Sequence, residues 1–266
     1  MQPDPAHPRP GARGVGRRLD PRRLDPRRQA ALIEAAVLGL TLLAFTRIHA
    51  LVGTNHAVAT DNAGALQAVE RALRIDVELG INRWLVDHPA LITPAVAFYR
   101  GYYVVLVGVL VWVFLRHAGG VYLQVRRTFV ALCGIALLVY WAVPMSPPRF
   151  ALAGAVDVVT EHDVLPGRAP RAPGSWTAMP SVHVAWSAWA AYAAWLALRR
   201  RHPRAAWAVW TFPLLMVADV FATANHYVLD VVGSAVVLAA AIGVARLWER
   251  LAGLRLARLA TDLQSN

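Results

Sequence analysis

Long apolar runs separated by short polar connections make up most of the chain. Each run is close to the roughly 20 residues that a helix needs to cross the core of a bilayer. We expect membrane-spanning helices at six places, residues 30–52, 91–115, 128–146, 179–198, 206–225 and 227–247. The first run lies too far along the chain for an ordinary signal peptide, so we expect it to be retained. The pattern predicts an all-α integral membrane protein with six transmembrane helices.

Composition supports this class. Hydrophobic residues make up 57% of the 266 residues and charged residues 16%, whereas a soluble domain carries roughly a quarter charged residues. All 27 basic residues are arginine, which together with the abundant alanine, valine and leucine suggests a high-GC, bacterial source. The net charge of +11 would suit nucleic acid, but the arginines gather between the apolar runs, as orientation signals do. We therefore expect membrane lipids as partners and no nucleic acid.

The arginine clusters predict the orientation. They comprise the N-terminal segment, Arg116, Arg126 and Arg127, Arg199, Arg200, Arg201 and Arg204, and Arg246, Arg250, Arg255 and Arg258. With six spans these clusters share one side, which the positive-inside rule makes cytoplasmic. We expect both termini inside a bacterial cytoplasmic membrane, with residues 53–90 and 147–178 on the outer side.

Three regions follow from this pattern. Residues 1–28 are rich in Pro, Arg and Gly and are predicted to be a disordered cytoplasmic tail, either a solvated orientation signal or a segment that binds anionic lipid headgroups. Residues 29–250 are predicted to form the six-helix domain, and 251–266 a C-terminal cytoplasmic tail.

The first outer connection has the pattern of an amphipathic helix at the membrane surface. Its apolar positions recur at helical spacing, at Leu66, Val69, Leu73 and Leu79, with Glu70, Arg71 and Arg74 among them. Packing alone accounts for such a helix.

Polar residues from three separated segments are expected at one membrane depth. Arg149 follows the third run, Ser181 and His183 lie where the fourth begins, and His226 and Asp230 lie where the sixth begins. All of these positions are on the predicted outer side. Ionisable residues at spanning segments are costly and tend to be functional.

Each of these residues has a use in phosphate chemistry. Pro180 at a first helical turn is favourable, and the start of that helix would be an anion site. Arg149 offers a planar fork for phosphate oxygens. His226 and Asp230 are four apart and would share a helix face, so that the carboxylate holds one ring nitrogen protonated and leaves the other as a nucleophile. His183 on the facing helix is placed to protonate a leaving oxygen.

Two other interpretations exist for these residues. A single histidine at a helix end is usually a packing residue, although the joint occurrence of two such helix starts with Arg149 argues against that here. Two histidines and an aspartate also suit a metal, but the positive charge of Arg149 opposes a cation and favours an anion. We expect no metal and no cofactor.

At these residues the sequence resembles the type-2 phosphatidic acid phosphatase superfamily, and most of all the branch of the inositol phosphorylceramide synthases and their bacterial relatives. The matching motifs are "PPR" at 147–149, "AMPSVH" at 178–183 and "NHYVLD" at 225–230. The similarity extends over about residues 55 to 245, mostly as hydrophobic pattern outside the motifs.

The resemblance implies a six-helix membrane fold and a metal-independent phosphohistidine mechanism. By matching position, His226 is the nucleophile, Asp230 orients it, and His183 is the general acid and then the base. Ser181 and Arg149 contact the phosphoryl oxygens.

The sequence departs from the superfamily's usual motifs. The chain has no Lys for the first motif, Val220 stands where the third usually carries Arg, and Val182 replaces the Gly of the second. These departures favour the phosphotransferase-like branch and leave Arg149 as the clearest cation, with Arg100 in "FYRGYY" as a second candidate. Asp219 is also unusual within a span, and either a pairing with Arg100 or a contact to a headgroup would explain it.

The resulting hypothesis is a lipid phosphatase or phosphotransferase that acts on a lipid phosphate or phosphodiester at the extracytoplasmic face. If an alcohol replaces water as acceptor, the enzyme would be an inositol-phosphate-type transferase that makes a phosphoinositol lipid. The charged outer loop 150–178 would be either the acceptor pocket or a solvated lid. A transporter or anion-binding membrane protein without catalysis is the alternative of another class.

Overall fold

The computed structural model describes residues 26–117, 119–162 and 176–265. Among them there are helices and no strands; a single bridge pairs Met145 with Thr177. The helices are α1 Pro26–His49, α2 His56–Leu73, α3 Glu78–Val86, α4 Pro89–Arg116, α5 Gly120–Ala142, α6 Pro148–Ala151, α7 Val158–Glu161, α8 Val182–Leu198, α9 Pro203–Ala208, α10 Thr211–Ala222 and α11 Val228–Ser265. The described residues leave out most of the predicted tail 1–28. They also leave out part of the charged outer loop 150–178, including Asp163, Arg168 and Arg171.

Five helical stretches are long and apolar enough to cross a membrane. They are Arg28–His49, Pro89–Arg116, Gly120–Ala142, Pro203–Ala222 and Val228–Arg255. The predicted span 179–198 corresponds to a shorter apolar helix, Val182–Leu198, because residues 179–181 precede the helix. The prediction of an all-α membrane protein is confirmed. The number of crossings and the side of each terminus stay predictions.

The third span begins earlier than its hydropathy indicates. Helix α5 starts at Gly120 and not near residue 128, so Arg126 and Arg127 lie within its second turn and are partly buried. A long arginine side chain can extend from such a turn to water, so polar first turns are compatible with a spanning helix.

Contacts divide the chain into residues Met1–Gly39 and Leu40–Asn266. In the first unit, the described residues form the first part of α1. Its apolar side chains are exposed, as at Leu32 (59%) and Ile33 (53%), which suits a surface that faces lipid.

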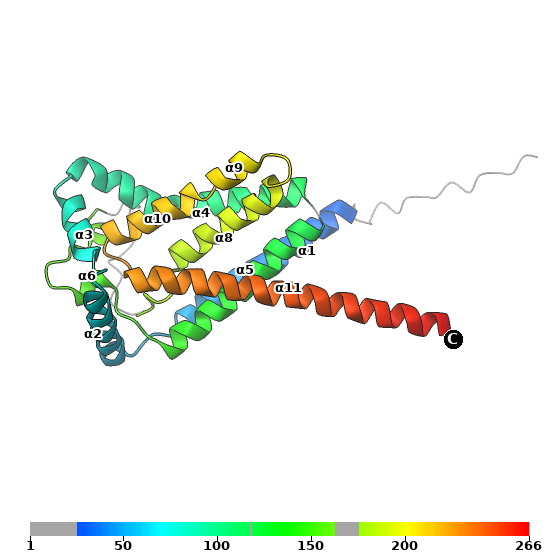
Figure 1. Ribbon diagram of the computed structural model, residues 1–266, viewed down its shortest axis with the longest axis horizontal. Helices are drawn as coiled ribbons and strands as arrows, with labels where there is room; N and C mark the ends of the chain where they lie inside the picture. The colour runs from blue at the N-terminus through cyan, green and yellow to red at the C-terminus, as the bar shows by residue number, and fades with distance from the viewer. Residues whose placement is uncertain (1–25, 118, 163–175, 266) are drawn as a thin grey trace, which may run out of the picture. The chain divides into compact units, whose positions relative to one another are not determined.

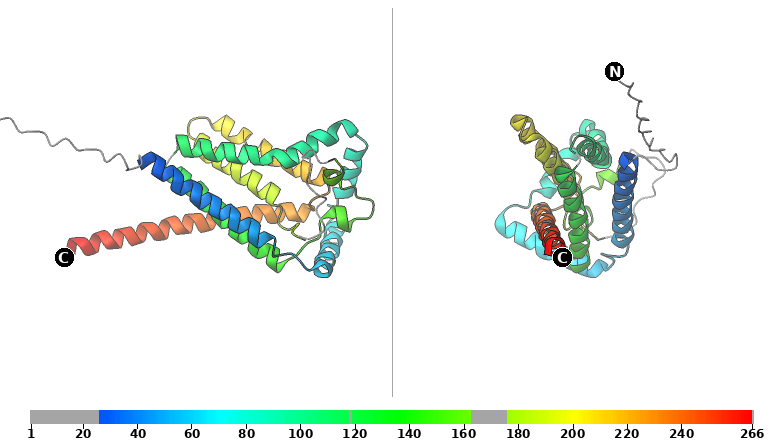
Figure 2. Two further views of the ribbon diagram at one scale, coloured as in Figure 1. Left: turned by 180° about the vertical axis from the view of Figure 1, so that it is seen from behind. Right: turned by 90° about the vertical axis from the view of Figure 1, so that its right-hand side faces the viewer.

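In the second unit, α8 is the central helix. It packs on α4, α5, α10 and α11, which surround it in Figures 1 and 2. Its residues Val184–Ala194 are buried with the exception of Ala188. A helix enclosed by protein meets no lipid, so α8 can be shorter than its neighbours. Its N-terminus is therefore deep in the protein, where a site can be shielded from water.

The first outer connection contains two helices, so the expectation of one amphipathic helix is corrected. Arg74 adopts a left-handed conformation (φ 57°) and ends α2, after which α3 begins at Glu78. The reason is the C-cap, where the Arg74 N–H bonds to Arg71 O and Glu70 O. In Figure 1 both helices lie at the end of the bundle where α11 begins.

Two small cores hold the connections to that end of the bundle. In the first, Ala63 and Leu66 of α2 pack on Met145, Ala178 and Tyr227. In the second, five buried residues from α3, α4, α7 and α10 pack together, namely Leu85, Ile92, Val96, Val158 and Ala222. Segments far apart in sequence are thus fixed around the starts of α8 and α11.

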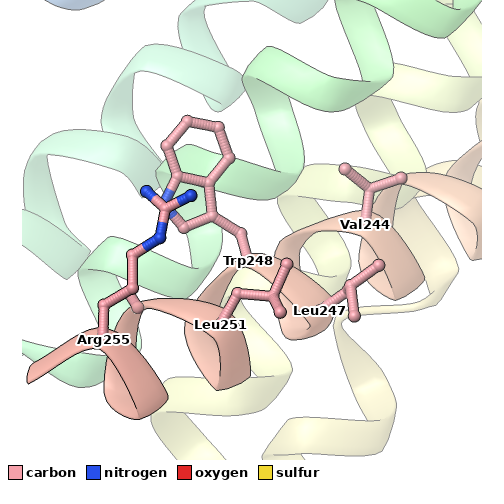
Figure 3. Close-up of a pocket in the computed structure, with 6 residues that line it drawn as sticks. Val244, Leu247, Trp248, Leu251 and Arg255 are labelled. Atoms are coloured by element: carbon pink, nitrogen blue, oxygen red, sulfur yellow. The ribbon is translucent and has the colours of Figure 1, made fainter. Parts of the chain in front are cut away.

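Helix α11 is continuous to Ser265 and so includes residues 251–265, which we assigned to a C-terminal tail. Its later turns carry a hollow of about 610 Å³, drawn in Figure 3 and lined by Val244, Leu247, Trp248, Leu251, Ala252 and Arg255. The hollow begins about 24 Å along the helix from Val228. It belongs to the far part of α11 and contains none of the predicted site residues.

Candidate functional site

His226 lies in the connection between α10 and α11, two residues before α11 begins at Val228. The expectation that it shares a helix face with Asp230 is therefore wrong in detail. The ring still reaches Asp230, whose Oδ2 is 3.4 Å from Nδ1, and Nδ1 is also 2.9 Å from the carbonyl oxygen of Ala178. Both neighbours are hydrogen-bond acceptors, and they favour the tautomer that has its proton on Nδ1.

Asp230 has a second task in the first turn of α11. Its Oδ2 accepts the N–H of Tyr227 at 2.9 Å, and the residue is completely buried. Helix α11 starts after His226 because this carboxylate caps it from within. Asp230 Oδ1 is buried without a hydrogen-bond partner among the described residues, so the carboxylate retains acceptor capacity toward the site.

A serine fastens the first turn of α11 to the start of α8. The Ser234 hydroxyl lies 2.9 Å from Ser181 O and 2.8 Å from Asp230 O, so its hydrogen is shared between the two carbonyls. The Ser181 N–H points at Asp230 O at 3.5 Å. The two helix starts are thus joined by hydrogen bonds as well as by packing.

Ser181 is the N-cap of α8, and its Oγ accepts the Val184 N–H at 3.3 Å. Pro180 therefore lies outside the helix, which corrects its expected place in the first turn; its carbonyl accepts the hydroxyl of Tyr140 at 2.9 Å. A serine hydroxyl that accepts one bond keeps its own hydrogen. Ser181 can still donate to an oxygen of an anion at this helix start.

His183 is the second residue of α8 and lies among aromatic rings. Its ring stacks on Tyr99 of α4 (centroids 4.1 Å apart, planes 21° apart) and lies 4.9 Å from the ring of Tyr102. The centroid of the His226 ring is 6.0 Å away. Two imidazoles at that separation can contact opposite sides of one small group, as the sequence predicts for His183 and His226.

Arg149 lies in α6 and is held against the start of α11. Its backbone N–H donates to Ala224 O at 2.9 Å, and Nη1 donates to Asn225 Oδ1. Nε forms an ion pair with Asp157 at 3.3 Å. The guanidinium is thus directed to Asn225, the residue before His226. It already contacts the carboxylate of Asp157, so a phosphate would have to compete with this carboxylate for Arg149.

Asn225 and Tyr99 connect these groups, and sequence reasoning assigned neither a role. Tyr99 Oη donates to Asn225 Oδ1 at 3.1 Å, the oxygen that Arg149 also contacts. Asn225 Nδ2 donates to Thr223 Oγ1 at 2.8 Å. Both residues lie within motifs quoted above, "FYRGYY" and "NHYVLD", and this was the sequence feature that could have identified them.

The residue before Asn225 is strained. Ala224 has φ 51° and is completely buried, and a left-handed conformation costs a non-glycine residue about 1 kcal/mol or more. Its N–H bonds to Phe221 O, which ends α10. The chain thereby reverses direction just before His226.

Two glutamates of the first outer connection, Glu70 and Glu78, are buried beside the site. The Val228 N–H donates to Glu78 Oε1 at 2.9 Å, and the Leu229 N–H donates to Glu70 Oε1 at 2.7 Å. Burial raises the pKa of Glu70 to about 8, with Glu78 and Asp230 adding smaller upward effects. Carboxyl groups thus occupy the N–H groups that a phosphate would use at the start of α11, which leaves the start of α8 for an anion.

Arg100 and Asp219 remain without an assigned role. Arg100 follows Tyr99 in α4 and is partly buried; a contact with phosphate stays a prediction. Asp219 is buried in α10, and its Oδ2 has no hydrogen-bond partner in the part of the chain that the structure describes.

Metal ligation was the alternative use of the histidines and Asp230. Among the described residues, no group of three or more His, Cys, Asp or Glu side chains is arranged to hold a metal ion. The neighbours of His226 Nδ1 are hydrogen-bond acceptors, which direct a proton toward them.

Comparison with known proteins places the chain in a family. Residues 64–244 match the PAP2 superfamily, a stretch that covers more than half of the chain and includes all three motifs. No curated protein and no solved structure matches it. On the extent of the match, the chain belongs to the PAP2 superfamily.

Proposed function

We propose that this protein is a metal-independent lipid-phosphate phosphatase or phosphotransferase that works through a phosphohistidine on His226. Membership of the superfamily indicates a phosphatase- or phosphotransferase-type function. The observation that supports the mechanism is the contact of His226 Nδ1 with Ala178 O and the Asp230 carboxylate. It keeps the proton on Nδ1, so Nε2 is the nucleophile.

In the first half-reaction, Nε2 of His226 attacks phosphorus, the N–P bond forms and the P–O bond to the lipid alcohol breaks. His183 donates a proton to the departing oxygen. Arg149 and the Ser181 hydroxyl donate to the phosphoryl oxygens, which stabilises the charge of the transition state.

In the second half-reaction, the acceptor loses its proton to His183, the acceptor oxygen bonds to phosphorus and the N–P bond breaks. With water as acceptor the product is inorganic phosphate or a phosphomonoester. With an alcohol as acceptor the product is the phosphate ester of that alcohol. If the donor is a phosphoinositol lipid and the acceptor is a second lipid alcohol, phosphoinositol passes from one to the other and the product is a new phosphoinositol lipid, as in the branch of the inositol phosphorylceramide synthases.

One observation supports that branch. Val220, where the superfamily usually carries an arginine, is completely buried in α10. No cation reaches the phosphate from this position, so Arg149 carries that task. The guanidinium contacts Asn225, the residue before His226, and Asp157.

We place the site on the extracytoplasmic face of a bacterial cytoplasmic membrane. The argument is the arginine distribution, which the positive-inside rule assigns to the cytoplasm. Arg199, Arg200 and Arg201 follow the C-terminal end of α8, whereas Ser181 and His183 lie at its N-terminal end. Arginines and site are thus at opposite ends of one helix.

The test uses purified protein in detergent with phosphatidic acid, a polyprenyl phosphate and phosphatidylinositol, each with and without chelator and added inositol. Wild type is compared with His226→Ala and with His88→Ala, an exposed histidine outside the site. We expect turnover that survives chelation, is lost in His226→Ala and is retained in His88→Ala. Equal turnover in His226→Ala would overturn the mechanism, and absence of turnover with binding intact would favour a non-catalytic anion-binding protein or transporter.

A further inference from the structure

The start of α11 is capped by carboxyl groups from three helices. Glu78 of α3 accepts the Val228 N–H, Glu70 of α2 accepts the Leu229 N–H, and Asp230 accepts the Tyr227 N–H. The first N–H groups of a helix have no partner within it, and negative groups near them are stabilising. These three bonds fix the chain directly after His226.

The two glutamates are buried side by side. Glu70 is 0% exposed and Glu78 is 2% exposed, and their carboxyl groups accept the N–H groups of two consecutive residues, Leu229 and Val228. Two buried carboxyl groups placed in this way repel each other when both are ionised, so that one of them favours its protonated form. Glu70 Oε2 has no hydrogen-bond partner among the described residues, which leaves this oxygen to carry the proton.

The mechanism described above gives this pair no chemical task, yet both residues come from surface connections and are buried beside the nucleophile. Asp230, whose charge is among the causes that raise the pKa of Glu70, is the residue that contacts His226. Loss of the cap would free residues 226–229 and with them the His226 ring.

We propose that Glu70 and Glu78 share one proton and, by capping α11, act as positioning residues that hold His226 in place for attack. The proposal rests on the proposed function. It makes the surface helices α2 and α3 part of the active site, because each supplies one half of the pair.

The shared proton gives the pair a pH dependence. The titratable groups that face Glu70 are Glu78 from α3, Asp230 from α11 and Tyr227 from the connection before it. None of them is a cation, so loss of the proton adds a negative charge that Glu78 and Asp230 repel, and burial together with this repulsion outweighs the favourable bond from the Leu229 N–H. Since the pKa of Glu70 is about 8, the cap should weaken as the pH rises through that value.

The test compares Glu70→Gln, Glu70→Ala and the control Glu249→Gln, which changes an exposed glutamate on α11. A glutamine oxygen can accept the Leu229 N–H while its amide donates to Glu78, so it mimics the protonated state at every pH. We measure kcat and KM for phosphate release from pH 6 to 10, with the lipid phosphate that wild type turns over.

We expect wild type and Glu249→Gln to lose kcat as the pH rises through about 8. Glu70→Gln should keep kcat near neutral pH and lose this alkaline decrease. Glu70→Ala should lower kcat by about a hundredfold with little change in KM, since a displacement of the nucleophile of about 1 Å has that cost. An alkaline decrease that is unchanged in Glu70→Gln, or a wild-type kcat in Glu70→Ala, would overturn the proposal.

A second measurement needs no turnover. The raised pKa of Glu70 contributes stability that is complete below the ordinary value of 4.5 and is lost as the pH rises to about 8. We expect the midpoint of thermal unfolding of wild type in detergent to fall across this range relative to that of Glu70→Gln. Equal pH dependence of the two would overturn proton sharing. If wild type turns over no lipid, the proposed function fails, while this comparison still decides whether the pair shares a proton.

Discussion

The ring of His226 is held more closely by the backbone of Ala178 than by the side chain of Asp230: Nδ1 lies 2.9 Å from the Ala178 carbonyl oxygen and 3.4 Å from Asp230 Oδ2. Ala178 belongs to the segment that leads into α8, the helix that carries His183. The segment before one histidine therefore orients the other. This contact adds to the Ser234 hydrogen bonds that already join the two halves of the site.

This contact predicts a graded response at Asp230. In Asp230→Asn the amide oxygen can still accept the Tyr227 N–H, and Ala178 O still accepts the Nδ1 proton, but the negative charge is lost. We expect the rate of phosphoenzyme formation in a single turnover to fall by about a hundredfold, less than in His226→Ala, which should have none. Asp87→Asn, at an exposed position after α3, is the control. Rates equal to wild type would show that Asp230 serves the fold alone.

Tyr99 is predicted to act through its ring on His183 and through its hydroxyl on Asn225. Tyr99→Phe keeps the stacked ring and removes the hydrogen bond to Asn225, the residue that also holds Arg149. Because Arg149 is then held less firmly for phosphate binding, KM should rise, and kcat should change less. Tyr99→Leu also removes the stack and should lower kcat. The measurement is the split between kcat and KM, with Tyr103→Phe, whose side chain is 48% exposed, as control. If both variants have the same effect on both constants, the ring and the hydroxyl have no separate roles.

Asp157 competes with phosphate for Arg149. In Asp157→Asn the ion pair at 3.3 Å is lost, while an amide oxygen can still cap α7 through the Thr160 N–H. An ion pair with partly exposed partners is worth about 1 kcal/mol or less, so the Kd of inorganic phosphate should fall by about two- to fivefold. Arg149→Ala should raise this Kd. Weaker phosphate binding in Asp157→Asn would show that Asp157 positions Arg149 for phosphate and does not oppose it.

The orientation of the site is tested by labelling. Cys133 is the only cysteine and is buried, so Cys133→Ser supplies a background for single cysteines. In intact cells, a membrane-impermeant maleimide should label Glu161→Cys, exposed at the end of α7, and should not label Arg201→Cys, exposed after α8. The reverse pattern would place the active site in the cytoplasm.

The sequence predicted most of the fold because the length and hydropathy of a spanning helix are properties of one segment. The same holds for the motifs: His183, His226 and Asp230 come together because their segments begin at one end of the bundle. The sequence predicted that Pro180 and His226 lie within the first turns of their helices, but both residues precede the helix. Hydropathy does not show that Ser181 caps α8 or that carboxyl groups cap α11 after His226.

Glu70 and Glu78 could not be predicted in this way. They are eight residues apart among arginines, a pattern typical of a solvated helix face. Their partners Leu229 and Val228 are 159 and 150 residues away in sequence, so only the folded chain shows that these carboxyl groups are buried. The role of Asn225 could not be predicted either, because it depends on contacts with Tyr99 of α4 and Arg149 of α6, which only the folded chain brings together.

The central claim is a covalent phosphate on His226. The most direct measurement is rapid quenching in alkaline detergent of wild type, His226→Ala and His88→Ala during turnover of a ³²P-labelled lipid phosphate, followed by denaturing electrophoresis under neutral or mildly alkaline conditions. We predict a labelled protein band in wild type and His88→Ala that survives base, is lost on prolonged exposure to acid, as a phosphoramidate is, and is absent from His226→Ala. A band of equal strength in His226→Ala, or one stable to acid, would contradict the account.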